Sequence, residues 1–149
     1  MHRHRVVLWL ALGAVLPLPL VARAATVEEQ VTAAYAAWDK ALNSGDPAAL
    51  AAFYTEDAMF LPASHDVIEG PNGVERFFTG LLGNGVHDHK LELLEVVDDG
   101  KGDLVVAAAK WSIQGKDASG APATFGGVAT HVFEKQPDGS LKLKGHTFN

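Results

Sequence analysis

Histidine and tyrosine side chains carry most of the chemistry that this sequence offers. His131 lies in residues 124–136, a predicted strand with apolar residues on both faces. If Phe125, Ala129 and Phe133 line the interior, His131 is the best general base in the chain, because imidazole exchanges protons near neutral pH. If the other face lies inside, His131 points to the back of the sheet. The periodicity leaves both alternatives open.

Two further side chains are candidates for acid–base roles. Tyr54 offers a hydroxyl either to a ligand or to a hydrogen bond at a helix end. His65 follows Pro62 in a turn, where we favour an exposed loop residue over a residue at the mouth of a pocket. If the chain is an enzyme, His131, Tyr54 or His65 would supply its acid or base.

The segment His87-Asp88-His89 places two imidazoles on the same face of a predicted strand, a spacing compatible with metal binding. The sequence identifies no third ligand, so we favour a solvated strand end and expect neither a metal site nor a cofactor. The chain has no cysteine. Thiolate catalysis, disulfides and cysteine-rich zinc sites are therefore excluded.

Aromatic residues predict either a ligand pocket or an ordinary core. Trp38 and Trp111 lie on faces that we expect to point inward, and Ala107 and Ala109 leave space beside Trp111. Large aromatic side chains dominate pockets and cores alike, so neither interpretation is preferred. In the first, a small apolar or amphipathic molecule would contact Trp38, Tyr54, Phe60, Phe77 and Trp111.

The elements that must position these side chains are three helices and a sheet. Apolar residues at spacings of three and four predict helices over 27–43 and 71–82, and Asp46-Pro47 begins a short helix that we extend to Tyr54. Residues 58–61 and 66–69 are short strands. After Gly85 the period becomes 2 and predicts four long strands joined by hairpins, with a bulge at Leu93-Leu94.

Helices segregated from strands predict an α+β fold in which the helices cover one face of an antiparallel sheet. Because residues 124–136 are apolar on both faces, the back of the sheet also needs cover. We expect a second copy of the chain to supply it.

Residues 1–24 predict a signal peptide, leaving 25–149 as one domain. His2-Arg3-His4-Arg5 is cationic, residues 6–20 are almost all apolar, and Ala22-Arg23-Ala24 suits a signal peptidase. The alternative, an uncleaved anchor, fits less well because the apolar run is short and contains prolines. We expect a periplasmic or secreted protein without a membrane attachment after cleavage.

The charge of the chain argues against nucleic acid as a partner. Removal of residues 1–24 takes away three arginines and no acid, so the formal net charge moves from -6 to about -9. Binding of phosphate backbones relies on Lys and Arg. We therefore expect no nucleic-acid binding.

A series of helix ends, turns and core positions runs through residues 25–149. Its members are Trp38, the junction Leu42-Asn43-Ser44-Gly45-Asp46, Phe53-Tyr54, Asp57-Ala58, Gly70, Phe77-Phe78 and the closing Asp138-Gly139-Ser140-Leu141-Lys142-Leu143. In these the chain resembles the superfamily of nuclear transport factor 2 and ketosteroid isomerase, and most of all its SnoaL-like or SgcJ/EcaC-type branch. The resemblance implies a cystatin-like α+β roll: a cone-like curved sheet wrapped around three helices, a mostly apolar pocket, and homodimers through the sheet back.

The same resemblance separates the chain from the isomerase itself. Trp38 stands where the isomerase has its oxyanion-binding tyrosine, Pro62 where it has its aspartate base, and Thr130 where it has its protonated aspartate. A ketosteroid-type proton transfer is therefore not expected unless other residues have taken over these roles. The alignment also implies that Thr130 lines the pocket, which would turn His131 to the sheet back.

Three functions follow as expectations. The first is an exported domain that binds a small molecule, without an assigned reaction. The second is a pocket enzyme of the isomerase, cyclase or dehydratase kind, and the third is a dimeric protein-interaction module.

Overall fold

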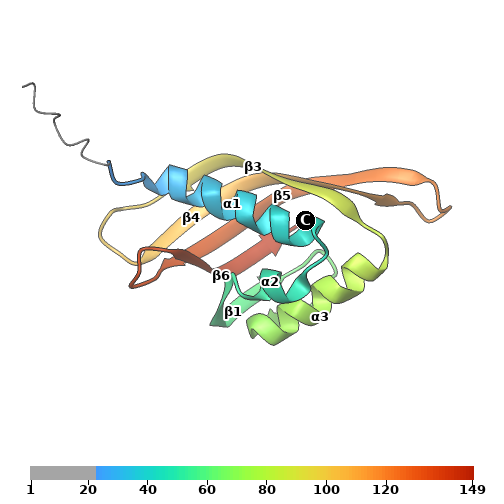
Figure 1. Ribbon diagram of the computed structural model, residues 1–149, viewed down its shortest axis with the longest axis horizontal. Helices are drawn as coiled ribbons and strands as arrows, with labels where there is room; N and C mark the ends of the chain where they lie inside the picture. Colours follow the sequence, from blue (N-terminus) through green and yellow to red (C-terminus); the bar gives the residue numbers. More distant parts are fainter. Residues whose placement is uncertain (1–22) are drawn as a thin grey trace, which may run out of the picture.

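The computed structural model describes residues 23–149, which form three helices and six strands (Figure 1). Nearly all of the predicted signal peptide, residues 1–24, lies outside this part of the chain. Among the described helices, none combines the length and the apolar character that a membrane crossing requires.

Helix α1 (Val27–Asn43) packs one face onto the sheet. It begins with a capping box, in which the Thr26 hydroxyl accepts a hydrogen bond from the Glu29 N–H while the Glu29 carboxylate accepts one from the Thr26 N–H. Its buried residues follow the helical period and are Val31, Tyr35, Trp38, Ala41 and Leu42. The helix ends where Gly45 takes φ 70°.

Helix α2 (Pro47–Ala51) is a single short turn capped by Asp46, whose Oδ1 accepts the Ala49 N–H at 2.9 Å. The prediction that this helix extends to Tyr54 is wrong, because Tyr54 begins strand β1 (Tyr54–Leu61). The two-residue strand β2 (Ile68–Glu69) pairs with β1 and leads directly into helix α3 (Gly70–Gly83).

The four long strands are β3 (His87–Val97), β4 (Leu104–Lys116), β5 (Pro122–Lys135) and β6 (Leu141–Phe148). The six strands form one sheet in the order β2-β1-β6-β5-β4-β3. All neighbours are antiparallel except β1 and β6, which run parallel. The predicted bulge is confirmed, since the pairing of β3 with β4 shifts register between Leu93 and Glu95.

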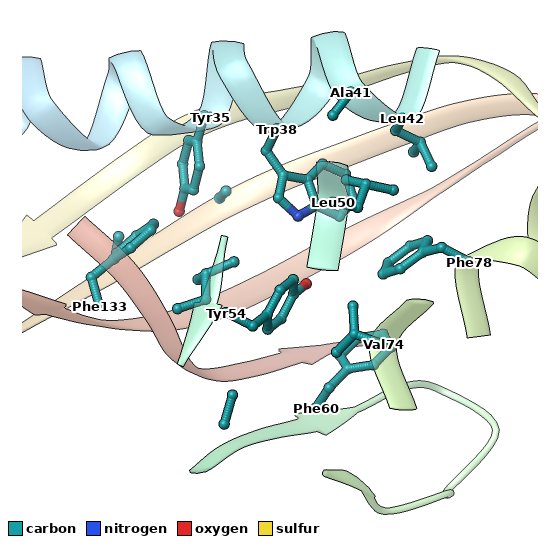
Figure 2. Packing of buried hydrophobic residues seen from close by; sticks show 14 of the residues in the cluster. Tyr35, Trp38, Ala41, Leu42, Leu50, Tyr54, Phe60, Val74, Phe78 and Phe133 are labelled. Atoms are coloured by element: carbon teal, nitrogen blue, oxygen red, sulfur yellow. The ribbon is translucent and has the colours of Figure 1, made fainter. Parts of the chain in front are cut away.

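The three helices lie on one face of this curved sheet and enclose the core with it, so the α+β roll is confirmed (Figures 1 and 2). Side chains alternate along β4, where Val105, Ala107 and Ala109 are buried and Val106 is exposed. In β5 the buried set is Ala129, His131 and Phe133. The face that carries His131 is therefore the inner one.

Candidate functional site

A cavity of about 360 Å³ opens between α1, α3 and the inner face of the sheet. Its walls are mostly apolar and aromatic, and three of the residues predicted to line a pocket do so: Trp38, Phe77 and Trp111. The polar groups at its surface are few. They include the imidazoles of His89 and His146, and the side chains of Asn84 and Lys116. This is the composition of a site for a small, largely apolar ligand with a few polar atoms.

His89 and Asp39 form an oriented pair in the cavity wall. The His89 Nδ1 lies 2.7 Å from the Asp39 Oδ1, and the second carboxylate oxygen accepts the Leu91 N–H at 2.9 Å. Because an ionised carboxylate can only accept, we assign the proton to Nδ1. The neutral ring then has its lone pair on Nε2, which is the arrangement of a general base.

The backbone of His89 is fixed independently of its ring. Asn43, the last residue of α1, donates through Nδ2 to the His89 carbonyl at 2.9 Å and accepts the His89 N–H through Oδ1 at 2.7 Å. With the Asp39–Leu91 hydrogen bond, these contacts dock α1 onto β3. The imidazole of His89 is therefore not needed to hold the helix on the sheet.

His146 enters the cavity from β6 and rests on a buried tyrosine. Its Nδ1 lies 2.8 Å from the Tyr54 hydroxyl, and its ring packs against Phe60 at 4.7 Å between centroids. Burial, together with the nearby imidazoles of His131 and His89, holds the pKa of His146 well below its usual range. The ring is thus neutral at physiological pH.

The indole of Trp38 completes this cluster. Its N–H is turned toward the Tyr54 hydroxyl (Figure 2) and partly offsets the rise in the pKa of Tyr54 that burial causes. The contact falls short of a standard hydrogen bond, and the buried indole nitrogen has no other partner among residues 23–149. Tyr54 accordingly keeps its proton at physiological pH.

His131 forms a second, deeper tyrosine–histidine pair. Its Nδ1 lies 2.7 Å from the Tyr35 hydroxyl, and its ring centroid is 4.5 Å from that of His146. Burial, helped by the positive charge that His89 can carry, lowers the pKa of His131 to about 4. His131 does not line the cavity but borders a separate space of about 10 Å³, room for one water at most.

Three more of the predicted site residues, Tyr54, Phe60 and His65, do not line the cavity. Tyr54 and Phe60 lie behind residues that do: Tyr54 bonds His146, and the Phe60 ring packs against those of His146, Phe77, Phe78 and Phe148. His65 is exposed in the turn before β2, with φ 66°, away from the cavity.

The position of Thr130 shows that the alignment with the isomerase is wrong at this residue. Thr130 is exposed on the sheet back and does not line the cavity, because neighbouring residues of a strand face opposite sides and His131 occupies the inner side. The expectation that His87 and His89 share a face is also wrong. Asp88 takes φ 52° and the register shifts beside it, so His87 lies in solvent while His89 turns inward.

Sequence reasoning missed His146 and Asp39 as functional residues. The regular alternation of Leu141 and Leu143 predicts that residue 145 faces inward. Instead, the register of β5 with β6 shifts between Val132 and Phe133, and His146 faces inward. Asp39 lies beside the buried stripe of α1, and only the partner strand reveals its role. Among residues 23–149, no three potential metal ligands converge on one point.

Comparison with known proteins places this geometry in a family. Among solved structures, Aln2 from a Streptomyces species is similar over 90% of this chain and 93% of its own, with 20% identity and a TM-score of 0.72. A ketosteroid isomerase-like protein from Erwinia carotovora has 20% identity over 83% of this chain and 96% of its own, with a TM-score of 0.70. These likenesses establish the fold alone.

A third similar structure is a calcium/calmodulin-dependent protein kinase II association domain, described as putative, from Xanthomonas campestris. It is 24% identical over 89% of this chain and 91% of its own, with a TM-score of 0.67. No curated protein matches the chain. The family model of the SnoaL-like domain matches residues 31–142, so the chain belongs to the SnoaL-like domain family.

Proposed function

We propose that the chain binds a small, largely apolar molecule in the cavity and that His89, oriented by Asp39, removes a proton from it. The observation that carries the proposal is the His89–Asp39 pair at 2.7 Å in the wall of an otherwise apolar cavity. Isomerisations, dehydrations and cyclisations can all begin with such a proton transfer.

The surroundings of His89 support a chemical role over a purely structural one. Its ring packs against Trp38, with centroids 4.9 Å apart, and lies parallel to Trp111 at 6.5 Å. Because aromatic rings cover His89 on two sides, the ring edge that carries Nε2 is the polar part of this residue that a ligand can contact. A base in an apolar, water-poor site abstracts a proton from carbon more readily than the same base in water.

A generic carbon acid tests this role without knowledge of the natural substrate. Nitrobenzisoxazole is a planar aromatic molecule whose ring opens when a base takes its carbon-bound proton: the C–H electrons complete a nitrile, the N–O bond breaks, and a coloured phenolate leaves. We expect the wild-type protein to accelerate this reaction and His89→Gln to lower the second-order rate constant by about 100-fold.

His87→Gln is the matched control, since His87 is a solvent-exposed histidine two residues away on the same strand. It should retain the wild-type rate. Equal rates for His89→Gln and wild type, with unchanged circular dichroism, would remove His89 from the proposal.

The second candidate is a carrier that binds without turnover, favoured by the mostly apolar cavity wall, to which six Phe and Trp side chains contribute. Binding of small aromatic molecules is expected in both cases. The carrier function is supported if ligands displace one another from the cavity while the protein abstracts protons no faster than free imidazole does.

We also propose that the protein is exported and that cleavage follows Ala24. The fold tolerates this cut, because the cap of α1 is Thr26 and the Arg23–Glu29 ion pair that would be lost is long, at 3.9 Å, and exposed. Mass spectrometry of the protein secreted by its host should then find a chain beginning at Ala25. A chain that retains Met1 in the mature protein would contradict export by this route.

A further inference from the structure

We infer that His146 donates a hydrogen bond from Nε2 into the cavity, that Tyr54 holds it in the required tautomer, and that the cavity therefore selects planar apolar ligands bearing a carbonyl or oxyanion oxygen. The inference rests on the ligand cavity of the proposed function and is independent of any reaction by His89.

The direction of the Tyr54–His146 hydrogen bond follows from the partners open to the hydroxyl. Among residues 23–149, the Tyr54 hydroxyl makes one hydrogen bond, to the His146 Nδ1 at 2.8 Å. The nearby Trp38 indole nitrogen cannot take the tyrosine proton, because it carries an N–H and no lone pair in the ring plane, so the Tyr54 O–H donates to His146. Nδ1 is the acceptor, and the single proton of the neutral imidazole lies on Nε2.

The donor so formed has no partner in the described part of the chain. Among residues 23–149, the side chain of His146 makes one hydrogen bond, the bond from Nδ1, and its ring lines the cavity. Buried polar groups are nearly always hydrogen-bonded. An oxygen of the ligand, or a water that the ligand displaces, is therefore the natural partner of Nε2.

The two cavity histidines have opposite polarity. His89 carries its proton on Nδ1, beside Asp39, and offers a lone pair at Nε2, whereas His146 accepts at Nδ1 and offers a proton at Nε2. Both rings pack against Trp38, at 4.9 Å and 6.1 Å between centroids. An acceptor and a donor at one end of an apolar cavity match a ligand in which an acidic C–H neighbours a carbonyl group. Ketones, enones and quinones have this pattern.

The tautomer is measured directly and without a ligand. In protein with ¹⁵N-labelled histidine, the two-bond couplings of the ring distinguish a protonated Nε2 from a protonated Nδ1, and the signals missing from His146→Phe identify His146. We expect Nε2 protonated and Nδ1 unprotonated in the wild-type protein. A proton on Nδ1 would overturn the inference, whatever the protein catalyses.

The role in binding is measured with a matched pair of ligands, indane and 1-indanone, which differ chiefly in one carbonyl oxygen. The ratio of their dissociation constants in the wild-type protein is divided by the same ratio in His146→Phe, which keeps an aromatic ring among Phe60 and Phe148. We expect the preference for the ketone to fall about tenfold when the donor is lost.

Tyr54→Phe provides a second variant that retains His146. Without the tyrosine proton the Nε2–H tautomer is no longer favoured, so the ketone preference should fall several-fold and the NMR couplings should change. Tyr35→Phe is the control, because Tyr35 bonds His131 outside the cavity.

The outcomes separate this inference from the proposed function. Equal binding of both ligands to wild type and His146→Phe overturns the donor role of His146 and leaves the cavity in place. If the wild-type protein binds neither ligand, the cavity itself fails, while the tautomer measurement still decides the state of His146.

Discussion

Three histidines on the inner face of one sheet obtain different properties from their neighbours. His89 gains a carboxylate, whereas His131 and His146 each gain only a neutral tyrosine hydroxyl and deep burial. Burial without a counter-charge disfavours the imidazolium form, and this lowers the pKa of His131 to about 4. The residue type alone therefore does not determine which of the three histidines is suited to act as a base.

The low pKa of His131 makes the folded protein sensitive to acid. Below about pH 6.5 the unfolded chain binds a proton at this residue that the folded chain does not bind, down to about pH 4. The free energy of unfolding should therefore fall with decreasing pH over this window. The loss through His131 is about 3 kcal/mol, since each pH unit is worth about 1.4 kcal/mol.

Urea unfolding between pH 6 and pH 4.5 measures this effect. The dependence of stability on pH should be shallower in His131→Asn than in wild type by about 1.4 kcal/mol per pH unit. The exposed His87→Asn should keep the wild-type dependence. Identical slopes for His131→Asn and wild type would show that the buried ring is protonated in the folded state.

At the scale of elements, the junction of α1 with β3 decides where the proposed base lies. The Asn43 side chain pairs with the backbone of His89 through one donor and one acceptor, much as a neighbouring strand would. From the sequence alone, Asn43 is predicted only to be part of a helix end. Its second role depends on β3, which lies more than forty residues further along the chain.

Asn43→Ala should remove both hydrogen bonds and release the start of β3. We expect a loss of about 1 kcal/mol in stability and a fall of about tenfold in proton abstraction from nitrobenzisoxazole, because a small displacement of the base weakens catalysis. Thermal melts and the colour assay measure the two effects. Thr32→Ala, at an exposed position of the same helix, should change neither; a parallel loss there would point to a general effect on α1.

The elements themselves were largely predictable from the sequence. The helical period identified α1 and α3, the period of 2 identified β3 to β6, and the slip at Leu93 marked a real bulge. The short-range pattern failed at Tyr54 and in β6, where pairing between distant segments determines conformation and facing. Tyr54 and His146 of the site come from these two strands, so the local sequence patterns could not predict that the two side chains meet at the polar end of the cavity.

At the scale of the whole molecule, the back of the sheet has no helix over it in the described part of the chain (Figure 1). Exposed apolar residues gather there: Val106 and Val128 are 40% and 48% exposed, and Val97, paired with Val106, is 58% exposed. Contiguous exposed apolar surface is typical of an interaction site. We propose that this face forms a homodimer.

Val106→Lys should place a charge at the centre of such an interface. We expect sedimentation at micromolar concentration to show a dimer for the wild type and a monomer for the variant. Val67→Lys is the control, since Val67 is an exposed valine before β2, away from the sheet back. A monomeric wild type would remove the homodimer and favour a different partner for this face.

The parallel pairing of β1 with β6 has a consequence for the time course of folding. Tyr54 and Leu143 are register partners, and β6 lies between β1 and β5 in the sheet. Pairing β1 with β6 closes the whole chain between Tyr54 and Leu143 into a loop, which is entropically costly and slows folding. The hairpins that join β3, β4, β5 and β6 can assemble earlier, from contacts nearer in sequence. The bond between Tyr54 and His146 spans the late junction, so His146 acquires its tyrosine partner only when β1 docks against β6.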